Sequence, residues 1–467
     1  MLNESRPNLT YRIRNSSYVF IPFFCNDNFD NDSINHIWRI KNQGNRYFLK
    51  YIVDKLTHDS SRVCCRPYLM DDEVRNKLGI VHSSRRCYLE TRQYAMDGEP
   101  FSFYIGEILL FLFETNIGFL IYKIDHCKDD THGIIASKNY HLKKIHTTLV
   151  YTEKDDGTKA ALVLGTTAIN SLSLLSEYIL ENTIGSKVEI FFNYAEKSER
   201  RSNILTHFNL KLEKKLSDTD NSTIEDILFH LKRNYHSEWE IEGASIYKDA
   251  EYFKASPYIR WGISSEATVC LTITDPETFF VGNSFYDNFH SYYLYEYVLA
   301  LHQKYALYYF LTNFKAESDL DELEKNIAEL ANFRAKYVFQ VISESETYQT
   351  VYSKQCKVFE LESLFADINE QVNRVMQIKK VADEHKLEEQ NDKINLILGL
   401  IAFLGVFSAI IDLNTLISWL EWILCQSQIM WVQAIATTTL ILVSITFLSI
   451  FIRANWSKLK KKKRRKK

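Results

Sequence analysis

The sequence predicts an α/β cytosolic domain plus a long α-helical stalk and two C-terminal transmembrane helices. Three observations support this fold class. Residues 1–285 contain short aromatic and β-branched runs separated by polar turns, residues 286–393 show helical periodicity, and two uncharged segments lie near the carboxy-terminal end. The 467 residues are enough for two or three domains that each bury a core.

The α/β domain is predicted for residues 1–285. The runs SYVFIPFF, NRYFLKYIV and CYLETRQYA are typical of strands, and FSFYIGEILLFLFETNIGFLIYKID predicts a hairpin that turns near Asn116 and Gly118. The segment TTAINSLSLLSEYILEN has helical periodicity and precedes another strand candidate, KVEIFFNYA. This mixture of strands and helices indicates one α/β domain. It would act as the sensor domain if the chain binds a ligand.

The stalk region is predicted for residues 286–393. SYYLYEYVLALHQKYALYYFLTNF predicts one helix, and Ser318 with Asp321 resembles a capping box at the start of a second, amphipathic helix over 318–343. A third run, Tyr348–Lys393, contains neither Gly nor Pro and repeats apolar residues at about 3.5-residue spacing. We expect this run to enter the first membrane span without a break, and its apolar stripe to be covered by self-association or by the 318–343 helix.

The membrane hairpin is predicted from two segments without charge, Ile394–Ile411 and Cys425–Ile452. At 1.5 Å per residue the first spans about 27 Å and the second spans more than the hydrocarbon core of roughly 30 Å. The predicted order is a pore-lining first transmembrane helix at 394–412, an outer loop at 413–424, a second transmembrane helix at 425–452 and a basic cytosolic tail at 453–467. The alternative, two core helices of a soluble domain, does not explain the tryptophans and the basic block at the ends of the segments.

Charge sets the predicted orientation. The chain carries −3 overall, and nine positive charges in the tail KLKKKKRRKK leave −12 for residues 1–457. Lysines also precede the first span, whereas the connecting loop is acidic, so both termini are expected on the cytoplasmic side of a multi-pass protein of the cell inner membrane. The eight cysteines show no metal-ligand or disulfide spacing, which indicates a reducing compartment. The lipid bilayer is therefore a predicted partner.

Small and polar residues share one face of the first span. Helical spacing places on this face Asn391, Asn395, Gly399, Ala402, Gly405, Ser408 and Asp412. Close helix packing would explain the small residues, but polar residues at membrane depth are costly unless they face water or one another, which favours a pore wall in a symmetric ring. Asp412, Asn414 and Glu421 would then form the outer mouth and concentrate cations there.

The usual catalytic signatures are missing, so we predict no catalytic residues and no enzymatic activity. The sequence has no Walker-type glycine loop, G-x-S-x-G elbow, H-E-x-x-H or G-x-G-x-x-G. DHCKDDTH at 125–132 could chelate zinc, although a polar strand exit is the favoured interpretation. The arginine pairs Arg85–Arg86 and Arg200–Arg201 suit bidentate capture of phosphate or carboxylate, with intramolecular salt bridges as the alternative.

This architecture resembles the CorA-like magnesium transporters, which have a cytosolic α/β domain, a long stalk helix, two carboxy-terminal spans and a basic cytosolic end. The resemblance covers the chain from about residue 100 and includes YYLYEYVLALHQKYALYYF, ANFRAKYVF and the heptads of Phe359–Val375. It implies a homo-oligomer, a pentamer in this family, that moves magnesium or another divalent cation. The identity of any bound metal is not predicted.

The Gly-Met-Asn motif of that family is absent, and Asp412-Leu413-Asn414 stands at the matching place. Divergent members without this motif include membrane effectors associated with type III CRISPR antiviral defence, which resemble channels gated by a nucleotide second messenger. That likeness implies a ligand-sensing cytosolic domain, with the arginine pairs as candidate phosphate contacts, and no direct nucleic-acid binding. A constitutive magnesium transporter, a membrane-tethered enzyme and a scaffold are the alternatives.

Overall fold

A computed structural model describes residues 15–25, 34, 37–41, 47–56, 64–80, 82–90, 100–144, 149–153, 159–164, 167–184, 188–191, 201–234, 251–276, 278, 285–314 and 320–424, with separate positions from 434 to 449. At some positions, chiefly within 149–167 and 403–424, the description covers the backbone alone. The contacts between residues divide the chain into two compact units, Met1–Val372 and Asn373–Lys467.

One mixed sheet of 14 strands organises the described part of the first unit. Most neighbouring strands are antiparallel, whereas β11 and β14 run parallel. The main path of the sheet has the order β12-β13-β14-β11-β1-β6-β5-β4-β7-β8-β9, and β2, β3 and β10 pair beside it. The strands are β1 Ser16–Cys25, β2 Arg39–Ile40, β3 Cys65–Leu69, β4 Arg86–Glu90, β5 Phe101–Phe113, β6 Ile117–His126, β7 Leu149–Glu153, β8 Lys159–Leu164, β9 Thr167–Ile169, β10 Val188–Ile190, β11 Asn203–Lys211, β12 Tyr252–Ser256, β13 Ile259–Ile263 and β14 Ala267–Thr274.

Helices lie between these strands and follow them. They are α2 Lys50–Leu56, α3 Asp72–Lys77, α4 His132–Lys143, α5 Leu172–Ile184, the 3₁₀ turn η3 Asp218–Asp220, α6 Asn221–Arg233, the π-helical turn η5 Phe289–Tyr293, α8 Leu294–Asn313, α9 Leu320–Tyr337, α10 Glu346–Val358 and α11 Leu361–Leu424. The predicted α/β character of the amino-terminal domain and the long carboxy-terminal helical region are both confirmed.

The antiparallel hairpin of β5 and β6 confirms the predicted turn. Asn116 adopts a left-handed conformation with φ 61°, which asparagine tolerates better than most residues. Gly118 is required for a different reason. A Cβ at this position would lie 2.2 Å from Cζ of Phe23, a residue that pairs with Gly118 across β1 and β6.

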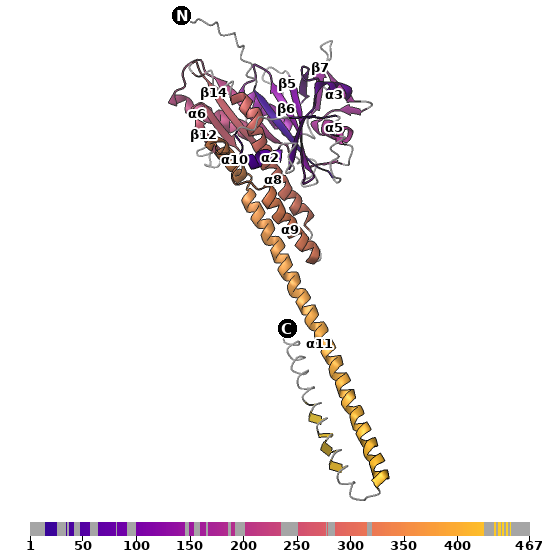
Figure 1. The fold of residues 1–467 in the computed structure, drawn as a ribbon. Coiled ribbons are helices and arrows are strands. Elements are labelled where there is room, and N and C mark those ends of the chain that lie inside the picture. Colours follow the sequence, from indigo (N-terminus) through magenta and orange to yellow (C-terminus); the bar gives the residue numbers. More distant parts are fainter. Residues whose placement is uncertain are drawn as a thin grey trace. The chain divides into compact units, whose positions relative to one another are not determined.

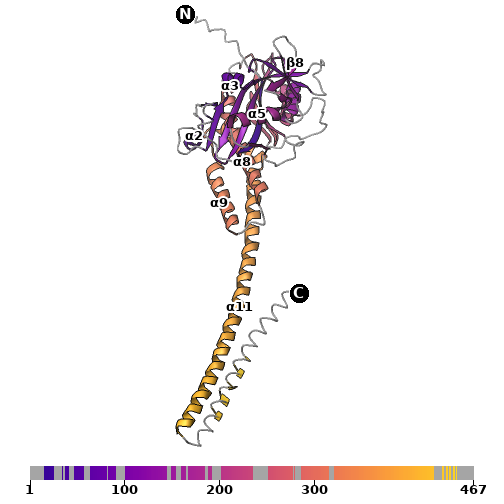
Figure 2. The ribbon, with the colours of Figure 1, turned by 90° about the vertical axis from the view of Figure 1, so that its right-hand side faces the viewer.

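Alternation along β1 shows how the sheet divides two cores. Tyr18 and Phe20 enter one cluster, which contains buried side chains of α8 and α10, whereas Val19 and Ile21 enter another, which contains α5. This separation follows from the two-residue side-chain period of a strand. On the α5 side, α4 and α6 form a third cluster with β11 and β14. Helices therefore cover both faces of the sheet (Figures 1 and 2).

Two local predictions were wrong. NRYFLKYIV was expected to form a strand, but Lys50–Leu56 form α2, whose residues Ile52 and Leu56 are buried one helical turn apart. The run Tyr348–Lys393 was expected to be one helix, but α10 ends at Val358 and α11 begins at Leu361, with Glu360 between them at φ 56°. A left-handed residue cannot continue an α-helix.

The first compact unit extends beyond the predicted domain boundary at 285, because α8 and α10 bury their side chains against the sheet. The second compact unit begins at Asn373, within α11. The predicted entry of the stalk helix into 394–412 without a break is confirmed, since α11 is continuous over 64 residues. It also includes 413–424, predicted as an outer loop, where the sequence has no Gly or Pro to end a helix.

Within the described residues, no helix combines the length and the hydropathy of a membrane-spanning segment. The second predicted span, 425–452, lies mostly outside the described residues.

Candidate functional site

The predicted pore face lies on α11 and is open in the single chain. Asn391, Asn395, Ala402, Ser408 and Asp412 are exposed, and Gly399 is half-buried. A Cβ added to Gly405 would meet nothing within 4 Å, so α11 has room for a close neighbour at this point. The side chains of Asn414 and Glu421 lie outside the described set. The predicted pore face therefore lies on one helix, and its described side chains are largely exposed in the single chain.

Large apolar side chains on the same helix are exposed as well. Their exposed fractions run from 45% at Leu396 to 61% at Leu404. The set comprises Ile394, Leu396, Ile397, Leu398, Leu400, Ile401, Leu404, Ile411, Leu416 and Trp419. At 3.6 residues per turn these residues cover a broad arc of the helix, about 200° wide, beside the predicted polar face. Soluble monomers rarely expose a contiguous apolar surface of this extent.

The first predicted arginine pair divides between two environments. Arg85 lines a cleft of about 430 Å³ whose wall includes Asn76, His82 and Ser84. Arg86 begins β4, and its Nε donates to the hydroxyl of Tyr104 over 3.3 Å. The pair therefore does not form one bidentate clamp, because neighbouring residues at the start of a strand point apart.

The second pair leads to a more concentrated group of charges. Arg200 lies outside the described residues, but Arg201 lies two residues before the start of β11 at Asn203, and its Nη1 lies 3.1 Å from Oε1 of Glu266. The other oxygen of that carboxylate, Oε2, lies 2.6 Å from Nζ of Lys143, the last residue of α4. The salt-bridge alternative considered for Arg201 is therefore realised in this structure.

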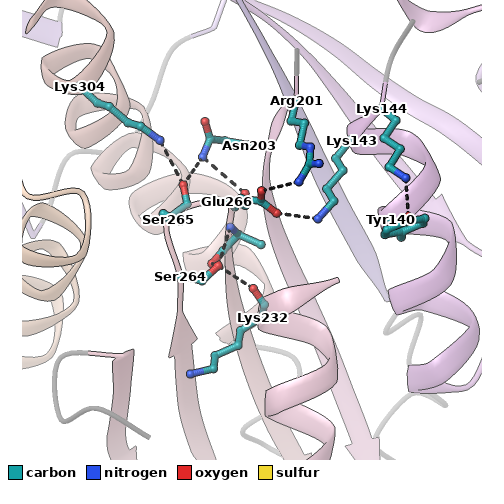
Figure 3. A network of polar contacts seen from close by, with 11 residues as sticks. Tyr140, Lys143, Lys144, Arg201, Asn203, Lys232, Ser264, Ser265, Glu266 and Lys304 are labelled. Carbon is teal, nitrogen blue, oxygen red and sulfur yellow. Dashed lines mark hydrogen bonds and ion pairs between the residues drawn. The ribbon is translucent and has the colours of Figure 1, made fainter. Parts of the chain in front are cut away.

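A third cation approaches from α8. Nζ of Lys304 donates to the carbonyl oxygen of Ser265 over 3.1 Å. Figure 3 shows Lys143, Arg201 and Lys304 converging on the Ser265–Glu266 segment from three different elements. We refer to Lys143, Arg201, Lys304 and Glu266 as the cationic cluster.

The sheet fixes the position of this cluster. β11 and β14 are parallel, so their amino-terminal ends meet at the same edge, and Ile204 pairs with Ala267 there. Asn203 holds the turn before β14, because its Nδ2 donates to the Ser265 carbonyl over 2.9 Å. The hydroxyl of Tyr305 on α8 donates to Oδ1 of Asn203 over 2.9 Å. The backbone around Glu266 is thus tied to both β11 and α8.

The cationic cluster carries more positive than negative charge. Burial alone would raise the pKa of Glu266, but its hydrogen bond and charge interaction with Lys143, supported by Arg201, hold the pKa below its ordinary value. Burial lowers the pKa of Lys304 to about 8, and the opposing effect of Glu266 is smaller. One ionised carboxylate is therefore paired with two cations, and the third, Lys304, contacts the neighbouring Ser265 carbonyl and is compensated only through space.

Sequence reasoning identified Arg201 but missed Lys143, Glu266 and Lys304. These residues come from distant parts of the chain and form no motif. The only local signal was the lysine pair at 143–144, placed where a helix ends and cations are favourable.

The zinc alternative for 125–132 finds no support among the described residues, in which no group of histidine, cysteine and acidic side chains could hold a metal. Asp130 instead forms an ion pair with Lys138 at 2.5 Å and accepts from the backbone N–H of Cys127 over 2.7 Å. These contacts fit the favoured interpretation of a polar strand exit.

Comparison of the chain with protein-family models, with curated proteins and with solved structures finds no match. The class of this protein therefore has to be argued from its sequence pattern and its own geometry.

Proposed function

We propose that the chain is a subunit of a CorA-like homo-oligomeric membrane channel, gated through its cytosolic domain by a nucleotide second messenger. The oligomer is a pentamer if the family resemblance holds, and both termini lie in the cytoplasm. The observation that carries the membrane assignment is the surface of α11, where ten large apolar side chains between Ile394 and Trp419 are exposed. Lipid, or neighbouring copies within lipid, would cover this surface.

Channel activity is proposed because polar and apolar residues share the helix. Asn395, Ser408 and Asp412 would be costly in contact with lipid, whereas a ring of copies would turn them toward water. Ligand binding to the cytosolic domain would shift an equilibrium between closed and open forms. The main alternative within the same architecture is constitutive magnesium transport. Steady magnesium flux into liposomes, without any added nucleotide, would favour that alternative.

Insertion of a charge into the apolar part of α11 is expected to impair membrane integration. An arginine at the centre of a membrane helix costs about 2.5–3.5 kcal/mol in insertion, which is roughly a hundredfold in equilibrium. We therefore expect Leu400→Arg to lower strongly the fraction of chain that floats with liposomes after alkaline extraction. Leu387→Arg is the matched control, because Leu387 is also exposed on α11 but precedes the predicted span. Equal flotation of the two variants would contradict the membrane assignment.

Removal of the charge at the predicted outer mouth is expected to lower cation conductance. Asp412 is exposed on α11, and a ring of such carboxylates would raise the local cation concentration about tenfold at low ionic strength. Asp412→Asn should therefore reduce single-channel cation current in 20 mM salt and have little effect in 1 M salt, where screening acts within about 3 Å. Glu384→Gln, at an exposed position of α11 about two helical turns before the predicted pore face, should leave the current unchanged. A current that falls equally at both salt concentrations would argue against electrostatic concentration by Asp412.

A further inference from the structure

We infer that the cationic cluster is a binding site for a phosphorylated small molecule, and that Glu266 occupies it in the ligand-free chain. The assignment of this site as the one that regulates the channel rests on the proposed function. Binding of the phosphate itself does not depend on that proposal and can be tested separately.

The first argument is the arrangement of donors. Lys143 and Arg201 contact opposite oxygens of one carboxylate, over 2.6 and 3.1 Å, so their donor groups are already directed at one anionic position. Lys304 donates to the neighbouring Ser265 carbonyl from a third direction. A phosphate offers more acceptor oxygens than a carboxylate and can therefore engage three cationic donors at once.

The second argument is access. The side chain of Glu266 is 38% exposed and that of Arg201 is 52% exposed, whereas Lys143 is only 3% exposed. Arg201 and Glu266 can therefore move into solvent at low cost, while Lys143 stays fixed on α4. A ligand phosphate that displaces the Glu266 carboxylate would regain the ion pair to Lys143 and leave Glu266 free to be hydrated.

The third argument is the unmet charge of Lys304. Its pKa near 8 reflects a cation that burial disfavours and that the Glu266 charge compensates only in part. Its ammonium group lies 4.9 Å from the centre of the Phe359 ring, next to the end of α10. A dianionic phosphate would stabilise the charged form of Lys304, and would join α4, β11 and α8 through one ligand. α8 packs against α10 in the same compact unit, so a ligand bound at Lys304 is linked through α8 to the helical region.

Titration calorimetry on the full chain in detergent micelles tests the site. Pyrophosphate is the first probe and ATP the second, at pH 7 and low ionic strength. Arg201→Gln is expected to weaken binding of both probes about tenfold or more, because a charge-assisted hydrogen bond contributes about 1.5–3 kcal/mol. Glu266→Gln is expected to strengthen binding, because it removes the competing carboxylate. If ATP binds more tightly than pyrophosphate, the nucleoside makes further contacts with the chain. If the two probes bind equally, the chain recognises the phosphates alone.

Arg39→Gln is the matched control, since Arg39 is an exposed arginine whose Nη1 lies 3.5 Å from Asp71 outside the cluster. It should bind both probes like the unmodified chain. If neither probe binds the unmodified chain, or if Arg201→Gln binds as well as Arg39→Gln, the site is refuted. Arg201 is exposed, so its variant should fold even if Glu266→Gln leaves the buried Lys143 unstable. Binding that obeys these expectations without any change in liposome conductance would refute the gating proposal and leave the site intact.

Discussion

Acidification from pH 7 to pH 5 is expected to destabilise the first compact unit by about 2 kcal/mol for each of two buried histidines, His207 and His302. Burial lowers the pKa of each imidazole to about 3, whereas the unfolded residue titrates near 6.5. Between these values the unfolded chain binds protons that the folded chain cannot. The unfolding free energy therefore falls as the pH falls below about 6.5 and is unaffected by these residues at higher pH.

The surroundings of His302 explain why it stays neutral. Its ring stacks on Phe113 at a centroid distance of 3.7 Å, and its Nε2 lies 2.8 Å from the Thr115 hydroxyl. Phe333 and Tyr337 of α9 also contact the ring. A protonated imidazole in this position would lack water and any carboxylate within hydrogen-bond distance among the described residues. His207 is likewise fully buried, with Nε2 at 3.0 Å from the Thr272 hydroxyl.

Hydrogen exchange of the full chain measures this effect. Protection of β5 and β6, corrected for the intrinsic pH dependence of exchange, reports the opening free energy of the first unit. We expect His302→Gln to remove about 2 kcal/mol of the loss between pH 7 and pH 5, because glutamine can still bond to Thr115 but does not titrate. His385→Gln, on the exposed surface of α11, should leave the pH dependence of this protection unchanged. Identical pH slopes for His302→Gln and the unmodified chain would refute the assignment.

The sequence predicted those parts of the fold that depend on local patterns. The β5–β6 hairpin follows from alternating apolar residues around Asn116, and α5 and α11 follow from helical periodicity. The failures have a common cause. Whether NRYFLKYIV forms a strand or a helix depends on what covers Ile52 and Leu56, and this contact is not encoded within the segment.

The candidate site was less accessible to prediction than the fold. Arg201 could be selected because two adjacent arginines are unusual in an acidic region, but its partner Glu266 lies on a separate element and has no distinguishing neighbours in sequence. The three cations meet only because β11 and β14 run parallel and α8 crosses their ends. Sequence spacing cannot show such a meeting. The predicted pore face, in contrast, lies within one helix. The residues that share this face can be predicted from the 3.6-residue period of the helix alone.

Glu296 is expected to have an effect of opposite sign to that of the histidines. It lies in α8 and is completely buried, and neither carboxylate oxygen has a hydrogen-bond partner among the described residues. The buried amide of Gln355 on α10 is likewise without a partner within that set. Burial raises the pKa of Glu296 well above its usual value, so the folded chain holds a proton that the unfolded chain releases. The unfolding free energy therefore falls as the pH rises from about 4.3 toward the folded pKa.

The variant Glu296→Gln isolates this contribution, because glutamine has nearly the same shape and cannot ionise. Relative to the unmodified chain, it should gain about 1.4 kcal/mol of stability from pH 5 to pH 6 and have the same stability near pH 4, where both side chains are neutral. Glu344→Gln, at an exposed position before α10, is the control and should show no pH-dependent difference. Parallel stability curves for Glu296→Gln and the unmodified chain would mean that Glu296 is paired or hydrated in solution. Because low pH favours the protonated Glu296 and high pH favours the neutral histidines, these opposing contributions should place the maximum stability of the first unit at about pH 6.5 to 7.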